Sequence, residues 1–482
     1  MAESLKTKVL NGLFWKVLEQ TGAQGIQFIV ALVLARLMSP EQCGTISLIT
    51  IFITIANTFV QSGFATALIQ KRNIREEDYS SVFWLTMGLS LFCYFLLYFS
   101  APWIAAYYKT DVLVNLIRLM GIVLFPGAVV SIQTAYVSRN LQFRLLFRAT
   151  MAAVILSGAV SIILAMQGFS YYALAAQQII YYFALMAVLF LLVHWHPLPV
   201  FRPERVRALF SFGWKILVSG LIDTVWMNIY GLVIGRKYSN AELGTYNRGE
   251  QFPKLITSNL SAAIQSVMLP AYARCQDSPD ELRSMCRRSI RISAFVIFPM
   301  MAGLIAVAKP LVILLLTDKW IKAWPYLAIM CVSYAVWPIH VINLQVMNAM
   351  GRSDLFLKLE IIKKALGIII LVLSLPFGIW PMLCLKVADE YICTFINAWP
   401  NRRLIHYGPL QQWGDVLPAL LTSVLMGAGT AALQLLPLAP LPLLLLQLLC
   451  GAAFYAVLAF AFNRESFEYV AGILRKGLHS VR

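Results

Sequence analysis

Long apolar stretches alternate with short polar connections along the whole of this 482-residue sequence. An α-helix rises about 1.5 Å per residue, so an apolar stretch of roughly 20 residues crosses a hydrocarbon core about 30 Å thick. The pattern therefore predicts an all-α, polytopic membrane protein with about 14 transmembrane helices. The predicted helices cover residues 11–36, 43–65, 80–101, 112–136, 147–167, 170–193, 208–234, 243–270, 289–308, 323–348, 356–376, 378–399, 414–436 and 441–462.

The composition agrees with this interpretation. Hydrophobic residues make up 60% of the chain and charged residues only 13%, which excludes an ordinary soluble domain. The eight cysteines are scattered singly, without a Cys-x-x-Cys motif, and most fall inside predicted helices, where a thiol behaves as a small hydrophobic group. We therefore expect no disulfide framework, no metal site and no cofactor.

The net charge of +17 follows from the positions of Lys and Arg in the connections rather than from an affinity for nucleic acid. When Lys and Arg in the connections and at the adjoining helix ends are sorted by side, 24 basic residues fall on one side of the membrane and 7 on the other. The positive-inside rule then places both termini in the cytoplasm. The smaller set is Arg36, Lys109, Arg236, Lys237, Lys309, Lys319 and Lys322; the larger set includes Lys71, Arg72, Arg205, Arg287, Arg288, Arg291 and Arg475.

A short motif occurs twice, 200 positions apart. Residues 35–45 read ARLMSPEQCGT and residues 235–245 read GRKYSNAELGT, with Arg, Ser, Gly and Thr in the same places. Arg36 ends the first predicted helix and Arg236 ends the seventh, so both copies face the same way. The repeat predicts two parallel six-helix lobes around a central cavity, followed by two added helices. The predicted divisions are an N-terminal lobe at 1–200, a C-terminal lobe at 201–405, and the last two helices with a cytoplasmic tail at 406–482.

Polar residues follow one face of three predicted helices. Their spacings of three and four residues place each set on one side of its helix. Two interpretations stay open: hydrogen bonds between packed helices, and the wall of a water-filled cavity between the lobes. We favour the cavity, because the faces are continuous and lie on repeat-related helices. The sets are Ser47, Thr50, Thr54, Asn57 and Gln61; Asn247, Gln251, Lys254, Ser258, Ser261 and Gln265; and Lys16, Gln20, Gln24 and Gln27.

Charged residues deep inside predicted helices are few. Asp223 lies near the middle of helix 208–234, where it could carry a coupling proton, hold a cation or form a structural ion pair. Lys16 and Lys215 lie at equivalent places near the cytoplasmic face, where snorkelling would also explain them. Glu19 could pair with Lys16 on the same helix.

Two further groups of polar residues have structural interpretations. Lys386, Asp389 and Glu390 are spaced so that they could neutralise one another, which favours a structural role. His340 is expected to be a satisfied core residue.

The sequence lacks common catalytic signatures. It contains no Gly-x-x-x-x-Gly-Lys-Ser/Thr loop, no nucleophile elbow and no His-Glu-x-x-His motif. The longest connection, around 271–288, lies on the basic side and leaves no room for an extracytoplasmic catalytic domain. We therefore expect a protein that is not an enzyme, and a membrane-embedded glycan transferase or polymerase is the minority hypothesis.

Several strings identify a resemblance to a known family. They are LARLMSPEQCGT at 34–45, SGFATALIQKRNI at 62–74, RNLQFR at 139–144, MLPAYARCQD at 268–277, LTDKW at 316–320 and NAMGRSD at 348–354. In this order and spacing, they make the chain resemble the polysaccharide-transport branch of the multidrug/oligosaccharidyl-lipid/polysaccharide exporter superfamily. It is most similar to the colanic acid exporters and lipopolysaccharide-biosynthesis proteins of that branch. The resemblance covers predicted helices one to eleven, and the last three helices match only in hydropathy.

This resemblance implies an inner-membrane flippase. It would move a polyprenyl-diphosphate-linked oligosaccharide from the cytoplasmic to the periplasmic leaflet by alternating access, for exopolysaccharide or lipopolysaccharide biosynthesis. Its partners would be this lipid-linked substrate, membrane lipid and polysaccharide-assembly proteins, without nucleic acid. The alternative within the superfamily is an ion-coupled multidrug antiporter, for which a more acidic or aromatic cavity is expected.

A diphosphate-linked sugar needs a wet cavity with basic groups for its phosphates and hydrogen-bonding groups for its hydroxyls. The candidate residues follow from the polar faces and the charges described above. The expected substrate-binding residues are Lys254, Arg248, Lys16, Lys215, Ser47, Thr54, Gln61, Gln251 and Gln265, and the ion-coupling candidates are Asp223 and Glu19.

Overall fold

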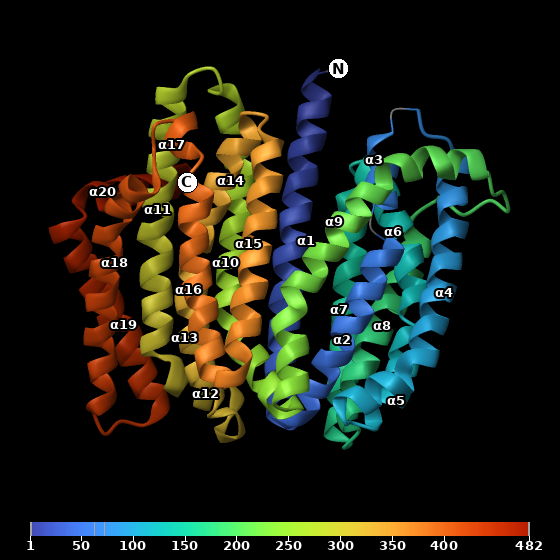
Figure 1. The fold of residues 1–482 in the computed structure, drawn as a ribbon, viewed down its shortest axis with the longest axis horizontal. Helices are drawn as coiled ribbons and strands as arrows, with labels where there is room; N and C mark the ends of the chain where they lie inside the picture. Colours follow the sequence, from blue (N-terminus) through green and yellow to red (C-terminus); the bar gives the residue numbers. More distant parts are fainter. Residues whose placement is uncertain (1, 62, 72, 481–482) are drawn as a thin grey trace. The chain divides into compact units, whose positions relative to one another are not determined.

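The computed structural model describes residues 2–61, 63–71 and 73–480, and its regular elements in these ranges are all helices (Figure 1). The prediction of an all-α fold is therefore confirmed. The chain divides into two compact units, residues 1–244 and residues 245–482, and each is described here by itself.

The first unit begins with a long helix and contains two short segments between its long ones. Its helices are α1 (Ala2–Leu37), α2 (Pro40–Gln61), α3 (Phe64–Gln70), α4 (Glu76–Tyr108), α5 (Val112–Gly121), α6 (Leu124–Arg139), α7 (Phe143–Met166), α8 (Ser170–Leu192) and α9 (Pro203–Lys237). The next helix, α10 (Asn240–Arg274), starts in this unit and continues into the second.

The second unit holds the rest of α10 and all later elements. These are α11 (Pro279–Ala306), α12 (Ala308–Leu316), η1 (Asp318–Trp320), α13 (Ala323–Ala335), α14 (Trp337–Ala349), α15 (Ser353–Ser374), η2 (Leu375–Phe377), α16 (Ile379–Ala398), α17 (Asn401–Leu404), α18 (Pro409–Ala432), η3 (Leu433–Leu435), α19 (Pro440–Phe462) and α20 (Arg464–Ser480).

Within the described residues, eleven helical segments are long and apolar enough to cross a membrane. The predicted count of about 14 is therefore not confirmed. The other three predicted helices, 243–270, 356–376 and 378–399, are present as α10, α15 and α16, but they fall outside this set of eleven. All three carry several charged residues, and these charges matter for the candidate site below.

Two predicted helices are each split into two segments. Residues 112–136 become α5 and α6, and residues 323–348 become α13 and α14. Each second segment carries a proline near its start, Pro126 and Pro338. Proline lacks a backbone N–H and its ring clashes with the carbonyl four residues earlier, which accounts for a break at each place. The two broken helices occupy the fourth place in each predicted lobe.

The repeated Gly-Thr motif marks a close helix crossing in the first unit. A Cβ atom added to Gly44, near the start of α2, would lie 1.7 Å from the carbonyl oxygen of Asn240. A Cβ atom added to Gly244 would lie 2.0 Å from the carbonyl oxygen of Pro40. The contact is reciprocal. Asn240 and Pro40 begin the two helices, and each lies against the glycine of the other helix. Only glycine allows the two backbones to approach this closely.

The connection between α8 and α9 is hydrogen-bonded to the first turns of α4. The backbone N–H groups of Leu198 and Arg202 donate to the hydroxyls of Ser80 and Ser81, at 3.0 Å each. The indole N–H of Trp84 donates to the carbonyl oxygen of Leu198 at 2.8 Å. Consistent with this attachment, α9 packs against α2, α3 and α4 within residues 1–244. The division into lobes at residue 200 stays a prediction.

Candidate functional site

The polar face predicted for the second helix lies on α2. Its hydroxyl groups donate to carbonyl oxygens of their own helix: Ser47 to Cys43 at 2.8 Å and Thr54 to Thr50 at 2.7 Å. A hydroxyl bonded in this way keeps its oxygen as an acceptor. Ser47 is partly buried and Thr54 is exposed. The face therefore offers acceptors to water or to a sugar without leaving its own donors unsatisfied.

Other polar groups along α2 bond to neighbouring helices of the same unit. The amide of Gln178 on α8 donates to the hydroxyl of Thr50 at 2.8 Å, and the hydroxyls of Thr58 and Thr224 lie 3.1 Å apart. The amide of Gln61 donates to the side-chain oxygen of Asn57 at 3.2 Å. Some of this face thus supplies the interhelical hydrogen bonds that the sequence left open as an alternative.

On α10 the predicted polar face carries one basic residue, Lys254, and the second basic candidate, Arg248, follows Asn247 of that face. Arg248 donates to the side-chain oxygen of Gln251 at 2.8 Å, and its guanidinium lies 5.6 Å from the ring centroid of Trp320. Lys254 and Gln265 are exposed, whereas Arg248 and Gln251 are partly buried. The aromatic and amide contacts hold Arg248 in one orientation, while Lys254 reaches into open space.

The acidic candidates of the first unit have different surroundings. The carboxylate of Glu19 lies 2.7 Å from the ammonium of Lys16 and accepts a hydrogen bond of 3.1 Å from the hydroxyl of Thr150 on α7. This is the ion pair that the sequence suggested as an alternative, and it occupies both groups in the described structure. Lys215 and Asp223 on α9 are both exposed. Their roles in binding and coupling stay predictions.

The second unit contains a buried ion pair that sequence reasoning did not find. Lys386 on α16 lies 3.5 Å from a carboxylate oxygen of Glu250 on α10, and the two side chains are only 13% and 17% exposed. The hydroxyls of Tyr246 and Tyr334 donate to the same oxygen at 3.0 and 3.2 Å. Lys386 also donates to the hydroxyl of Tyr246 at 2.9 Å. We call Tyr246, Glu250, Tyr334 and Lys386 the Glu250 cluster.

The prediction that Lys386, Asp389 and Glu390 neutralise one another stays a prediction, and the structure gives each of them a further partner. Lys386 lies near Glu250, and Asp389 lies 3.7 Å from the thiol of Cys393. Glu390 lies 3.7 Å from the Nε2 atom of His340 on α14. Lys386 and Glu390 lie one turn apart on the same face of α16, and each also meets a side chain of another helix.

His340 joins a second polar group beside α16. Its Nδ1 atom lies 2.9 Å from the amide nitrogen of Asn397, and both side chains are buried. On α15, Lys363 and Glu360 form an ion pair of 2.5 Å. The helices α10, α15 and α16, which are not among the eleven candidate spans, therefore each carry ionisable side chains that are paired. Ionisable groups inside a membrane bundle often mark the pathway of an ion or a substrate.

One signal in the sequence could have directed attention to the Glu250 cluster. The predicted helices 243–270 and 378–399 each hold charges of both signs, and a helix of this kind must face protein or water rather than lipid. The partners themselves could not be paired, since helical periodicity reports only neighbours on the same helix. Among the described residues, no three His, Cys, Asp or Glu side chains converge as metal ligands would.

The polar faces and the Glu250 cluster describe a helical membrane protein with charged groups held inside its bundles. A family model described as "Polysaccharide biosynthesis protein" matches residues 33–325. The chain belongs to this family. The resemblance stated from the sequence is thereby confirmed.

Two relatives in this group have names that refer to polysaccharide production. The succinoglycan biosynthesis transport protein ExoT of Rhizobium meliloti (strain 1021) is 24% identical over 328 residues, 68% of this chain and 66% of ExoT. The lipopolysaccharide biosynthesis protein WzxC of Escherichia coli (strain K12) is 24% identical over 373 residues, 76% of this chain and 75% of WzxC.

Solved structures define the fold of this polysaccharide biosynthesis family member. The lipid II flippase MurJ in an inward closed conformation is similar with a TM-score of 0.77 over 94% of this chain and 99% of MurJ, at 15% identity. An inward-facing MATE family multidrug resistance transporter is similar with a TM-score of 0.59 over 85% of this chain and 94% of the transporter, at 14% identity. The protein therefore has a transporter fold with several membrane-spanning helices.

Proposed function

We propose that this protein moves a polyprenyl-diphosphate-linked oligosaccharide from the cytoplasmic to the periplasmic leaflet of a bacterial inner membrane. The observation that carries this proposal is the fold shared with MurJ over nearly the whole of both chains, in a member of a polysaccharide biosynthesis family. The oligosaccharide would be destined for exopolysaccharide or lipopolysaccharide. Both termini would lie in the cytoplasm, and the other proteins of polysaccharide assembly are the expected partners.

The polar faces supply chemistry that suits this cargo. Sugar hydroxyls would meet Ser47, Thr54 and Gln61 on α2, and Gln251 and Gln265 on α10. The diphosphate would meet Lys254 and Arg248, because guanidinium and ammonium groups bind phosphate oxygens through charge-assisted hydrogen bonds. Lys16 and Lys215 are candidates for the same role nearer the cytoplasmic surface. The prenyl chain needs no polar site and would stay in lipid.

We further propose that the Glu250 cluster couples transport to an ion gradient, beside the earlier candidates Asp223 and Glu19. The carboxylate is held by one ammonium and two tyrosine hydroxyls, and in the proposed cycle it would exchange this pairing for a proton or a cation. Exchange between the paired and the ion-bound carboxylate would give the Glu250 cluster two states that differ in net charge. Glu19 has a similar environment, since it bonds to Lys16 and Thr150, and it stays a candidate for the same role.

A flipping assay with the purified full-length protein in liposomes tests the transport proposal. The reporter is a short-chain polyprenyl-diphosphate sugar, and an impermeant sugar-cleaving enzyme measures the fraction in the outer leaflet. We expect protein-dependent exposure of the reporter, and no exposure of a fluorescent phosphatidylcholine in the same vesicles. A protein that leaves the diphosphate sugar in its original leaflet, under every imposed ion gradient, would contradict the proposal.

The multidrug antiporter is the second candidate, since the MATE family fold is also similar. The basic residues on the α10 face disfavour it, because cationic drugs would be repelled by Arg248 and Lys254. Efflux of a cationic dye from the same liposomes distinguishes the two, and we expect none. A transferase or polymerase would change the mass of the reporter. We expect the reporter to have the same mass before and after the assay.

A further inference from the structure

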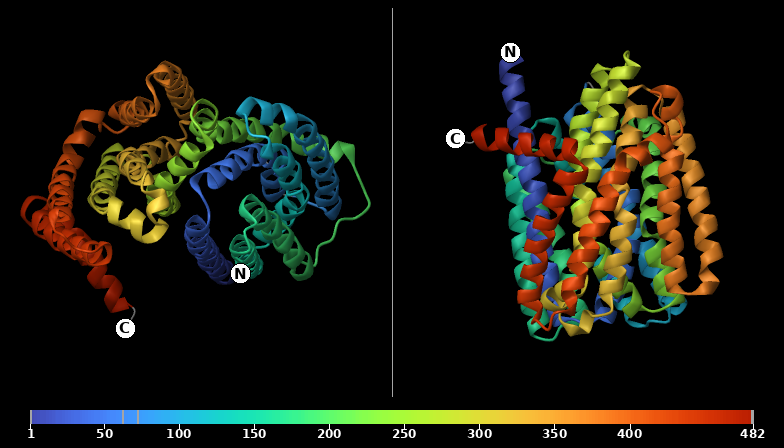
Figure 2. Two further views of the ribbon diagram at one scale, coloured as in Figure 1. Left: turned by 90° about the horizontal axis from the view of Figure 1, so that it is seen from below. Right: turned by 90° about the vertical axis from the view of Figure 1, so that its left-hand side faces the viewer.

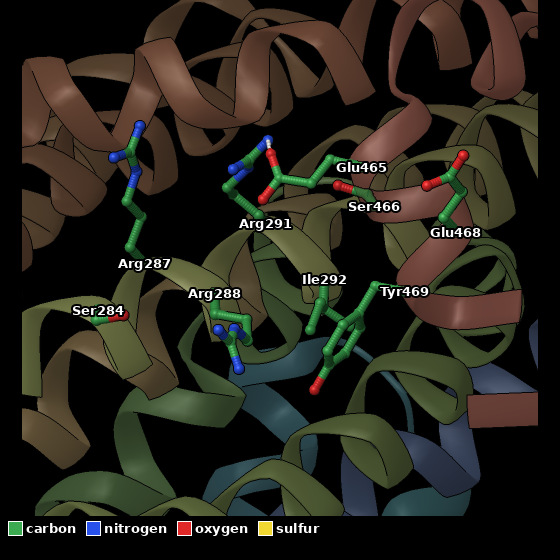
Figure 3. A pocket seen from close by; sticks show the side chains of 9 residues that line it. All are labelled: Ser284, Arg287, Arg288, Arg291, Ile292, Glu465, Ser466, Glu468 and Tyr469. Carbon is green, nitrogen blue, oxygen red and sulfur yellow. Dashed lines mark ion pairs between the residues drawn. The ribbon is translucent and has the colours of Figure 1, made fainter. Parts of the chain in front are cut away.

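A cavity of about 460 Å³ lies between α11 and α20, inside the second unit (Figure 3). Three arginines of α11 line it, and Arg291 meets Glu465 of α20 (Figure 3). We call it the α11–α20 pocket. Its lining residues are Ser284, Arg287, Arg288, Arg291 and Ile292 from α11, and Glu465, Ser466, Glu468 and Tyr469 from α20.

The direction of α20 places this pocket at the edge of the membrane. Only Asn463 separates α20 from α19, and α20 runs across the direction of the long helices of its unit rather than along them (Figure 2, right). Phe467 on α20 packs on Phe460 of α19, with ring centroids 6.0 Å apart, while Glu465 and Glu468 are exposed. A helix with one apolar and one charged side, lying across a bundle end, is typical of the membrane–water interface.

The charges of the pocket leave one arginine without a carboxylate. Arg287 is held by Asp415 of α18 through two hydrogen bonds of 2.8 and 2.6 Å, and Arg291 pairs with Glu465 at 2.8 Å. The guanidinium of Arg288 lies 5.6 Å from the ring centroid of Tyr469. In the part of the chain that the structure describes, no carboxylate lies within ion-pairing distance of Arg288.

Glu468 does not change this balance. It pairs with Arg464 at 2.6 Å at the rim, so that this acidic group is also compensated. The pocket as a whole therefore carries one positive charge in excess, at Arg288, with the hydroxyls of Ser284 and Ser466 in the same lining.

We propose that the α11–α20 pocket binds the phosphodiester headgroup of a membrane phospholipid, with Arg288 holding the phosphate. A phosphodiester carries one negative charge, which matches the single excess charge, whereas a polyprenyl diphosphate carries more. The planar guanidinium fork fits phosphate oxygens, and the serine hydroxyls can donate to them. The acyl chains would extend along the apolar surfaces of the neighbouring helices.

This site has a structural consequence that is separate from transport. A phosphate on Arg288 would lie between α11 and α20 and would hold the interfacial helix to the bundle. The bound lipid would thus fix the end of the chain at the depth of the headgroups, whether or not the protein carries an oligosaccharide.

Native mass spectrometry of the purified full-length protein tests the proposal. Phosphatidylethanolamine and phosphatidylglycerol are added in turn, and apparent affinities are measured for the wild type, Arg288→Ala and Arg283→Ala. Arg283 lies on the same helix but does not line the pocket, so it serves as the matched control. We expect Arg288→Ala to weaken binding of the tightest lipid about tenfold or more, as the loss of one charge-assisted contact implies, and Arg283→Ala to leave it unchanged.

Three further measurements keep the test decisive. Arg288→Lys, which keeps the charge, should recover part of the affinity, and thermal unfolding identifies a variant that has failed to fold. Inorganic phosphate and farnesyl diphosphate are added as competitors. Wild-type lipid affinity in a folded Arg288→Ala variant would overturn the proposal. So would displacement by inorganic phosphate alone, which would indicate a free-anion site, or tighter Arg288-dependent binding of farnesyl diphosphate, which would indicate a diphosphate site.

Discussion

Glu250 and Lys254 lie one turn apart on α10, yet their surroundings differ sharply. Glu250 is buried against Lys386 and two tyrosine hydroxyls, whereas Lys254 is exposed. An exposed ammonium beside a satisfied carboxylate remains available for a ligand. At the residue scale, Glu250 therefore contributes to internal charge balance, and Lys254 is the residue of α10 that we propose for an anionic cargo.

The flipping rate of variants at position 254 should depend more on the charge of the new side chain than on its size. We expect Lys254→Ala to slow flipping of the diphosphate sugar by roughly tenfold or more, since a charge-assisted contact contributes about 1.5 to 3 kcal/mol. Lys254→Arg should retain part of the rate, and Lys254→Glu should abolish it by repulsion. The liposome assay measures all three, and Asn259→Ala, at an exposed position of α10 that is not among the candidate residues, is the control. Flipping by Lys254→Glu at the wild-type rate would show that the cargo does not meet this residue.

Variants of the Glu250 cluster should distinguish its effect on thermal stability from its effect on ion coupling. Glu250→Gln alone leaves Lys386 buried without a carboxylate, and the loss of one member of a buried pair costs roughly 3 kcal/mol. The double variant Glu250→Gln with Lys386→Met removes both charges and should recover most of the thermal stability. If the carboxylate carries the coupling ion, the double variant should flip the reporter independently of the imposed gradient. A double variant with wild-type gradient dependence would leave the cluster only a structural role.

Sequence reasoning worked at this scale for neighbours on one helix and failed between helices. The spacing of Lys16 and Glu19 predicted their ion pair, because three residues bring two side chains onto the same face. Nothing in the sequence links Glu250 to Lys386, which are far apart along the chain. The same limit explains why His340 was not predicted as a neighbour of Glu390, since the two residues lie on different helices.

At the scale of elements, the hydropathy pattern located the long helices but not their ends or breaks. The predicted helix 289–308 begins at Pro279 in the structure, because the arginines that resembled a connection continue the helix to the membrane surface. The breaks near Pro126 and Pro338 were missed because proline is tolerated in membrane helices and does not interrupt an apolar run. The helices α3, α12 and α17 are too short to cross a membrane, and α20 carries charged residues along its length, so hydropathy predicted none of the four.

The crossing of α2 and α10 gives a prediction for these elements. Gly44→Ala would force a methyl group against the backbone at Asn240, and overpacking of this kind costs typically about 1 to 3 kcal/mol. We therefore expect a lower melting temperature for the purified variant in detergent. Gly88→Ala on α4 is the control, because an added Cβ there meets nothing within 4 Å. Equal melting temperatures for Gly44→Ala and the wild type would show that the crossing yields without strain.

At the scale of the whole molecule, the basic residues predict an orientation. The connection around Arg72, which lies outside the described residues, and the tail around Arg475 should be cytoplasmic. The loops around Pro40 and Lys319 should be periplasmic. Single cysteines at these places, on a background without the natural cysteines, can be probed with an impermeant thiol reagent. Labelling at position 475 in intact cells would reverse the proposed orientation.

The contacts of Gly44 and Gly244 are also related to each other by symmetry. Gly44 meets the backbone at Asn240 while Gly244 meets the backbone at Pro40, so the same two positions of the repeat face each other in exchanged roles. Reciprocal contact of this kind defines an interface on a two-fold axis between identical subunits. The crossing of α2 and α10 thus has a local two-fold relation, so a bulkier residue at position 44 and one at position 244 would strain equivalent backbone contacts.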